Sequence, residues 1–158
     1  MRRFTPIELA IALSLAGTIA AIAVPTFARE LHASRFSEPI DALQRMSTQT
    51  ISYVEVHHEL PASAPMTPEA PPRGAKQAYP AEIWEHPTWK ALSFQPAPDG
   101  VPIAYAYAFD AHADGFVAHA HGDLDGDGVL STFEMRGKAK PGEPLAIEPG
   151  LYVESELE

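Results

Sequence analysis

A short acidic segment carries the residue types that bind hard metal ions. Residues 123–134 have the sequence D-L-D-G-D-G-V-L-S-T-F-E, in which three aspartates alternate with other residues and a glutamate closes the segment. Carboxylates at this density repel one another, and a calcium ion, which takes about six to eight oxygen ligands, relieves that repulsion. The segment therefore predicts a calcium site, with a solvated acidic turn as the alternative.

The spacing of this segment resembles the twelve-residue calcium loop of EF-hand proteins. Gly128 takes the sixth position, where the loop turns sharply. The resemblance implies the following ligands: Asp123, Asp125, Asp127, Val129, Ser131 and Glu134. Because a strand pattern precedes the loop and the chain has no second such loop, we expect one structural calcium ion of weak affinity.

The chain contains no cysteine, which excludes disulfides, zinc–thiolate sites and thiol catalysis. A calcium ion would then do the work of a disulfide by tying the end of a sheet to the C-terminal tail. A stretch of this type after a strand also weakly resembles the C-terminal region of some pilin-like proteins.

Three histidines, His112, His119 and His121, lie close together in the sequence just before the acidic segment. Residues two apart on a strand share a face, so His119 and His121 are candidates to share a metal ion. The alternative is that they are exposed polar residues beside a loop.

Other chemistry is missing from the sequence. We find no nucleophile motif with a base, no phosphate-binding loop and no HExxH motif, so we expect that the protein is not an enzyme. Lys and Arg number 11 against 21 Asp and Glu, and this acidic balance makes nucleic acid an unexpected partner.

The N-terminus contains an uncharged run that matches a membrane in length. No charged residue occurs from Leu9 to Ala28, and at about 1.5 Å per residue a helix of this length spans roughly 30 Å, the thickness of a bilayer core. Arg2 and Arg3 precede the run and favour a cytoplasmic N-terminus with export of the C-terminal part. The run predicts a single-pass anchor in the lipid bilayer.

Two simpler interpretations of this segment stay open. A cleaved signal peptide also begins with basic and apolar residues, but here the apolar run continues directly into Arg29 and Glu30. In a plain anchor, Thr5 and Glu8 would only form the capping box of a helix that has Pro6 at its first position.

Residues 4–9, F-T-P-I-E-L, resemble the start of mature type IV pilins and of type II secretion pseudopilins. The family pattern is an aromatic first residue, a glutamate at the fifth position and an apolar helix. Pro25 falls where many members carry a helix-kinking proline. The likeness covers residues 4–28.

The resemblance implies that a prepilin peptidase cuts after Arg3, where the family normally has glycine, and that Phe4 is then N-methylated. Glu8 would be the assembly carboxylate, because a carboxylate in hydrocarbon costs several kcal/mol unless it is paired or protonated. Its partner would be the amino group of a neighbouring subunit. The resemblance further implies an inner-membrane assembly platform and a periplasmic or extracellular filament.

The remaining chain supplies an amphipathic helix and a sheet. An apolar stripe at three- and four-residue spacing favours a helix after the anchor, although Pro39 should kink or interrupt it. The stripe consists of Phe36, Ile40, Leu43, Ser47, Ile51 and Val54, and Asp41 and Arg45 should pair on the other side of the helix. Tyr105, Tyr107 and Phe109 alternate with alanines, and Asp114-Gly115 marks a hairpin turn. We expect the aromatic residues around Pro87, which include Trp84 and Trp89, to belong to the core, and residues 145–147 and 151–153 to form short edge strands. We expect these parts: a possible leader remnant at 1–3, a transmembrane helix at 4–28, an amphipathic helix at 29–59, a Pro-rich connector and loop region at 60–100, and an antiparallel sheet with the calcium loop at 101–158.

The expected fold is α+β and pilin-like, with a long N-terminal helix packed on a small antiparallel sheet. The expected function is a structural subunit, either a major or minor pilin or a pseudopilin, that assembles with itself or related subunits. A membrane-anchored, exported calcium-binding module that never assembles is the main alternative. An exported enzyme with an uncleaved anchor is a remote third.

Overall fold

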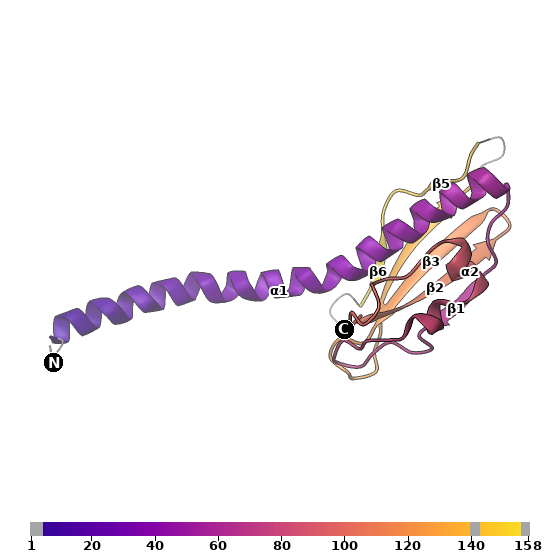
Figure 1. The fold of residues 1–158 in the computed structure, drawn as a ribbon. Helices are drawn as coiled ribbons and strands as arrows, with labels where there is room; N and C mark the ends of the chain where they lie inside the picture. Colours follow the sequence, from indigo (N-terminus) through magenta and orange to yellow (C-terminus); the bar gives the residue numbers. More distant parts are fainter. Residues whose placement is uncertain (1–4, 140–142, 156–158) are drawn as a thin grey trace. The chain divides into compact units, whose positions relative to one another are not determined.

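The protein combines an N-terminal apolar helix with an antiparallel sheet, so its fold is α+β (Figure 1). The computed structural model describes residues 5–139 and 143–155, with the backbone alone described at residues 9 and 25–35. The chain divides after Ser37 into two compact units. The first contains most of the apolar helix, and the second contains the sheet.

Helix α1 runs from Pro6 to His57 without interruption. The expected interruption at Pro39 is absent: the helix continues through this residue, although proline donates no backbone hydrogen bond. The other expectation, a kink at Pro39, stays a prediction. At the other end, Thr5 and Glu8 form a capping box in which each side chain accepts from the other residue's backbone N–H. Pro6 takes the first helical position, which needs no N–H donor.

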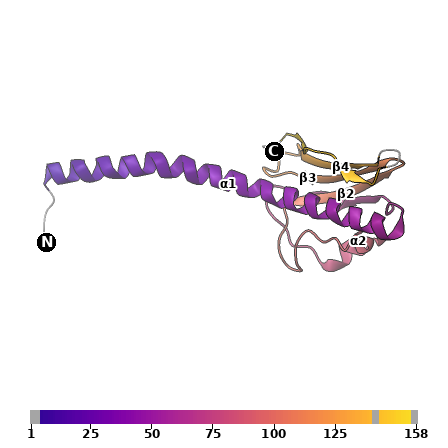
Figure 2. The same cartoon turned by 90° about the horizontal axis from the view of Figure 1, so that it is seen from above.

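The part of α1 in the second unit buries one face against the sheet (Figure 2). Its buried residues recur at three- and four-residue spacing: Pro39, Ala42, Leu43, Met46, Ser47 and Thr50. The predicted stripe shared only Leu43 and Ser47 with this set, and Ile40 is 37% exposed. The buried face of the helix therefore includes small and polar side chains, whereas a prediction from hydrophobicity alone places isoleucine and valine there.

The sheet is antiparallel throughout, with β1 at one edge and the order β1-β2-β3-β4-β5; β6 also pairs with β4. Its strands are β1 (Ala64–Thr67), β2 (Tyr105–His112), β3 (Gly115–Gly122), β4 (Ser131–Lys138), β5 (Ala146–Ile147) and β6 (Tyr152–Glu154). The predicted hairpin is confirmed, because β2 and β3 pair along their whole length and His112 faces Gly115 at the turn.

One face of the sheet is aromatic and buried, and the other carries small and polar side chains. The buried aromatic residues of the strands are Tyr105, Tyr107, Phe109, Phe116 and Phe133. The short helices η1 (Ala81–Trp84) and α2 (Pro87–Ala91) add Trp84 and Trp89 to this core, as the sequence predicted. The Trp89 indole N–H donates to the Thr67 hydroxyl at 3.0 Å, which ties α2 to β1.

The connector is more structured than its composition predicts. Residues 64–67 form the edge strand β1, and Pro71 and Pro72 are buried. Prolines are tolerated in this segment because an edge strand leaves half of its backbone donors unused.

Candidate functional site

The acidic loop follows β3 and is held in shape by its own aspartates. The Asp123 carboxylate accepts from the Gly126 N–H at 2.8 Å, and the Asp127 carboxylate accepts from the Val129 N–H at 2.7 Å. The Asp125 carboxylate accepts from the Asp127 N–H at 3.1 Å. Gly128 has a φ of 94°, so the sharp turn expected there is present and suits glycine.

Three of the predicted ligands come together in this loop. Carboxylate oxygens of Asp123, Asp125 and Asp127 all lie within 4.8 Å of one another. Asp123 is 1% exposed, whereas the other two face solvent. The cluster is therefore open on one side and can hold a metal ion through oxygen ligands. Val129 lies in the same loop with an exposed side chain.

The structure does not bring Ser131 and Glu134 into this cluster. Both lie on β4, three residues apart, and residues at an odd spacing on a strand point to opposite faces. The Ser131 hydroxyl is buried and donates to the Gly122 carbonyl at 3.2 Å. In an EF-hand the loop leads into a helix. Here it leads into strand β4, which directs the closing glutamate, Glu134, away from the aspartates.

Glu134 lies instead among charged groups on the outer face of the sheet. Its Oε2 accepts from Arg136 Nη2 at 2.7 Å, and its Oε1 lies 3.5 Å from His119 Nδ1. The pairing of Glu134 with His119 was not predicted, because residues 131–134 match the end of a calcium loop. The alternation of Phe133, Met135 and Gly137 was the signal that could have revealed β4.

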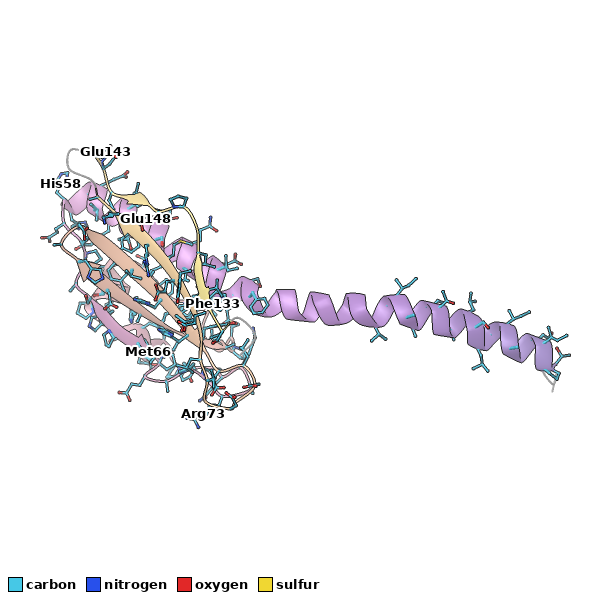
Figure 3. All side chains as sticks on the ribbon, turned by 180° about the vertical axis from the view of Figure 1, so that it is seen from behind. His58, Met66, Arg73, Phe133, Glu143 and Glu148 are labelled. Carbon is cyan, nitrogen blue, oxygen red and sulfur yellow. The ribbon has the colours of Figure 1, made fainter. Side chains whose placement is uncertain are left out.

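The Pro-rich connector contacts the acidic loop. The Gly74 N–H donates to the Asp123 carbonyl at 2.8 Å. Arg73, which is labelled in Figure 3, has its Nε 3.8 Å from Asp123 Oδ2. Arg73 is largely exposed, so this ion pair adds little stability. The contact nevertheless places one positive charge at the buried end of the aspartate cluster.

The N-terminal segment presents an apolar surface. Pro6–Val24 is long and apolar enough to cross a membrane, a property shared by signal sequences. Its large side chains are exposed: Ile7, Ile11, Leu13, Leu15, Ile19, Ile22 and Val24. Among the described residues, Glu8 makes polar contacts only with Thr5, through the capping box. Phe4 lies outside the described residues, and Pro25 is described only as part of the α1 backbone.

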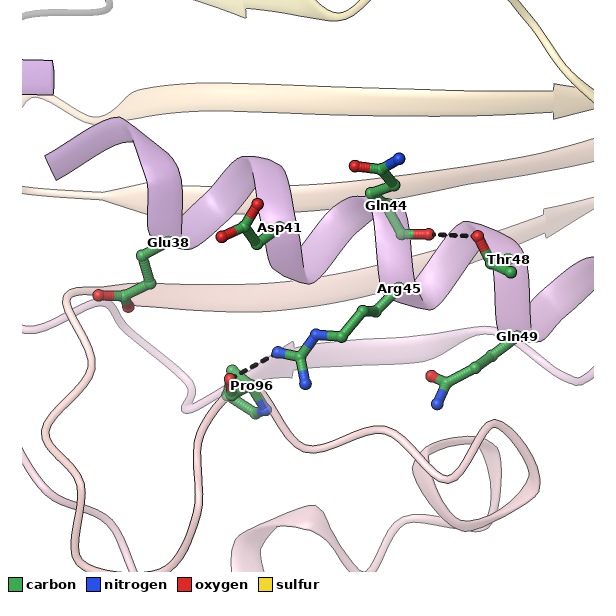
Figure 4. Close-up of a pocket in the computed structure, with 7 residues that line it drawn as sticks. All are labelled: Glu38, Asp41, Gln44, Arg45, Thr48, Gln49 and Pro96. Atoms are coloured by element: carbon green, nitrogen blue, oxygen red, sulfur yellow. Dashed lines mark hydrogen bonds between the residues drawn. The ribbon is translucent and has the colours of Figure 1, made fainter. Parts of the chain in front are cut away.

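A shallow groove of about 610 Å³ runs beside α1 in the second unit (Figure 4). Arg45 crosses it and donates to the Pro96 carbonyl at 2.7 Å. The predicted ion pair between Asp41 and Arg45 is absent from the contacts of the described residues, because the arginine reaches the loop instead. At the end of the groove, Glu38 accepts from Lys76 and from the Ala104 N–H, each at 2.7 Å.

Comparison with protein-family models, with curated proteins and with solved structures finds no match to this chain.

Proposed function

We propose that the protein is a structural subunit of a type IV pilus or of a type II secretion pseudopilus. The observation that carries the proposal is the N-terminal segment, where an aromatic residue, a glutamate four residues later and a long apolar helix follow one another. An exposed apolar helix needs either lipid or other helices around it. The membrane surrounds the helix with lipid before assembly, and a filament of like subunits then surrounds it with other helices.

The Glu8 carboxylate favours assembly of this helix with its neighbours. It lies one turn inside a segment that is otherwise free of charge as far as Ala28. In the described structure only Thr5 satisfies its carboxylate. An amino group of a neighbouring subunit would add a full positive charge, and ionic hydrogen bonds in an apolar setting are roughly twice as strong as neutral ones. Assembly thereby stabilises a group that the lipid alone does not.

A calcium ion in the acidic loop is the second part of the proposal. Asp123, Asp125 and Asp127 would supply carboxylate oxygens, and the Val129 carbonyl remains the expected backbone ligand. The ion would clip the loop between β3 and β4 to the connector through the Asp123 backbone. Such a clip suits an exported subunit that has no disulfide.

Replacement of Glu8 tests the assembly role. The full chain with Glu8→Ala should insert into the inner membrane at wild-type levels and be missing from sheared filaments. The matched control is Thr18→Ala, which removes a hydroxyl bonded only to the Ser14 carbonyl of the same helix. Wild-type filament incorporation of the Glu8→Ala protein would contradict the proposal.

A second function stays open because of one observation. The capping box already explains Glu8 as a local helix start, which an anchor that never assembles would also use. In that case the protein is a monomeric, membrane-anchored, exported calcium-binding module. A Glu8→Gln variant separates the two, because glutamine preserves a capping box and removes the charge. Assembly should fail with Gln if the carboxylate has an intermolecular partner.

A further inference from the structure

The outer face of the sheet carries a compact group of metal-binding side chains away from the acidic loop. His119 and His121 lie on the same face of β3, with parallel rings whose centroids are 5.9 Å apart. The strand register places Glu134 directly opposite His119, and Thr132 opposite His121. Two imidazoles and a carboxylate from adjacent strands therefore share one patch.

Carboxylates flank both ring nitrogens of His119. Nε2 lies 3.1 Å from Asp110 Oδ2, and Nδ1 lies 3.5 Å from Glu134 Oε1. A neutral imidazole has one N–H, which we place on Nε2 because its contact with Asp110 is the shorter of the two. The lone pair of Nδ1 then faces a carboxylate oxygen, and these two acceptors repel each other unless a proton or a metal ion lies between them.

The separation of these two acceptors fits a shared metal ion. Zinc binds imidazole and carboxylate at about 2.0–2.2 Å with tetrahedral angles, which places neighbouring ligand atoms roughly 3.4 Å apart. The observed 3.5 Å between Nδ1 and Oε1 is close to this value. Because Arg136 holds the other oxygen of Glu134, Oε1 is the oxygen left for an ion.

The neighbouring contacts resemble the outer shell of a metal site. A carboxylate on the second nitrogen of a metal-binding histidine fixes its tautomer, and Asp110 is in that position. His121 Nδ1 lies 3.0 Å from the Thr132 hydroxyl, which leaves Nε2 available as a ligand.

We infer that His119, His121 and Glu134 bind a divalent transition metal ion of the zinc class, with Asp110 orienting His119. Imidazole ligands favour zinc over calcium, so this site and the acidic loop select different ions. His119 and Glu134 side chains are 17% and 16% exposed, which leaves room for a water as fourth ligand. In the described structure the donor atoms of His121 do not converge with this pair, so binding would draw its ring toward them.

Equilibrium dialysis of the full chain in detergent against Zn²⁺ tests this inference. The protein carries no affinity tag, and excess calcium occupies the acidic loop. We expect one zinc ion per chain, at least tenfold weaker binding for His119→Asn, and roughly tenfold weaker binding for Asp110→Asn. His112→Asn, in the same sheet, is the matched control and should bind as the wild type does.

Substitution of Co²⁺ gives an independent signal, because tetrahedral imidazole coordination produces strong visible absorption that calcium sites do not. Glu134→Gln preserves side-chain size and serves as a second test if the His119→Asn variant misfolds. Circular dichroism checks the folding of both variants. Absence of stoichiometric zinc binding would overturn the inference. So would zinc binding that survives His119→Asn and is lost in Asp125→Asn.

Discussion

The backbone N–H of Gly74 donates to the carbonyl of Asp123 at 2.8 Å and joins the Pro-rich connector to the first residue of the acidic loop. Gly74 has a φ of 67°, and a Cβ at this position would lie 3.4 Å from the Asp125 carbonyl oxygen. Changes in the connector should therefore alter calcium binding by the aspartate cluster, which lies about fifty residues away in the sequence.

Gly74→Ala tests this coupling. The left-handed backbone should cost about 1 kcal/mol of unfolding free energy. Relief of this strain should displace the Gly74 N–H from the Asp123 carbonyl and thereby weaken calcium binding. Gly100→Ala is the control, because Gly100 has a φ of 77° and nothing within 4 Å of its Cβ position. Thermal unfolding with and without calcium should show that only Gly74→Ala reduces the calcium-induced shift. Equal shifts in the two variants would exclude the coupling.

Calcium should raise the melting temperature of the full chain in detergent. For a dissociation constant near 1 mM, a tenfold excess of calcium stabilises the folded state by about 1.4 kcal/mol. Asp125→Ala should abolish the shift, because it removes one of the three clustered carboxylates. Asp41→Ala, which removes an exposed carboxylate from α1, should leave the shift intact. A melting temperature that ignores millimolar calcium would rule out the clip.

Tyr107 should make the protein sensitive to alkali. Its buried hydroxyl has no hydrogen-bond partner among the described residues, and burial, followed by the nearby Glu38 charge, raises its pKa well above 10.0. The unfolded tyrosine loses its proton first, so stability is complete below about pH 10 and declines as the pH rises above it.

Tyr107→Phe should remove this contribution to the alkaline decline. At pH 8 it should raise the unfolding free energy by about 1 kcal/mol, because an unpaired buried hydroxyl is no longer desolvated. Urea unfolding at pH 8 and pH 10.5 measures both effects, with Tyr53→Phe on α1 as the control. A Tyr107→Phe protein that is much less stable at pH 8 would show that the hydroxyl has a partner.

Gly137 is required by the ring that covers it. It faces Phe116 across the β3–β4 pair, and a Cβ there would lie 2.1 Å from Phe116 Cε1. Gly137→Ala should therefore cost about 1–3 kcal/mol of unfolding free energy through overpacking. Adding Phe116→Leu should recover part of the loss, which a double-mutant cycle detects as coupling. Additive losses would mean that the ring does not restrict this position.

The sequence predicted the elements whose periodicity is uninterrupted. Alternating tyrosines and alanines located the β2–β3 hairpin, and the uncharged run located the N-terminal part of α1. The short apolar segments near residues 146 and 152 were correctly expected as edge strands. In each case hydrophobic pattern and turn chemistry favoured the same structure.

Prediction failed where one local pattern concealed another. The match to a calcium loop covered residues 131–134, so the start of β4 and the turn of Glu134 toward His119 were missed. Prolines concealed β1, because its pairing with β2 depends on distant residues. The cross-strand contacts of His119 follow from register, which composition and local spacing do not determine.

Mass spectrometry of the native N-terminus tests the central claim most directly. If the N-terminal helix is a pilin-type assembly segment, protein isolated from its own cells should begin at Phe4 and carry one methyl group on its α-amino nitrogen. An unmodified chain that still begins with Met1 would contradict this account.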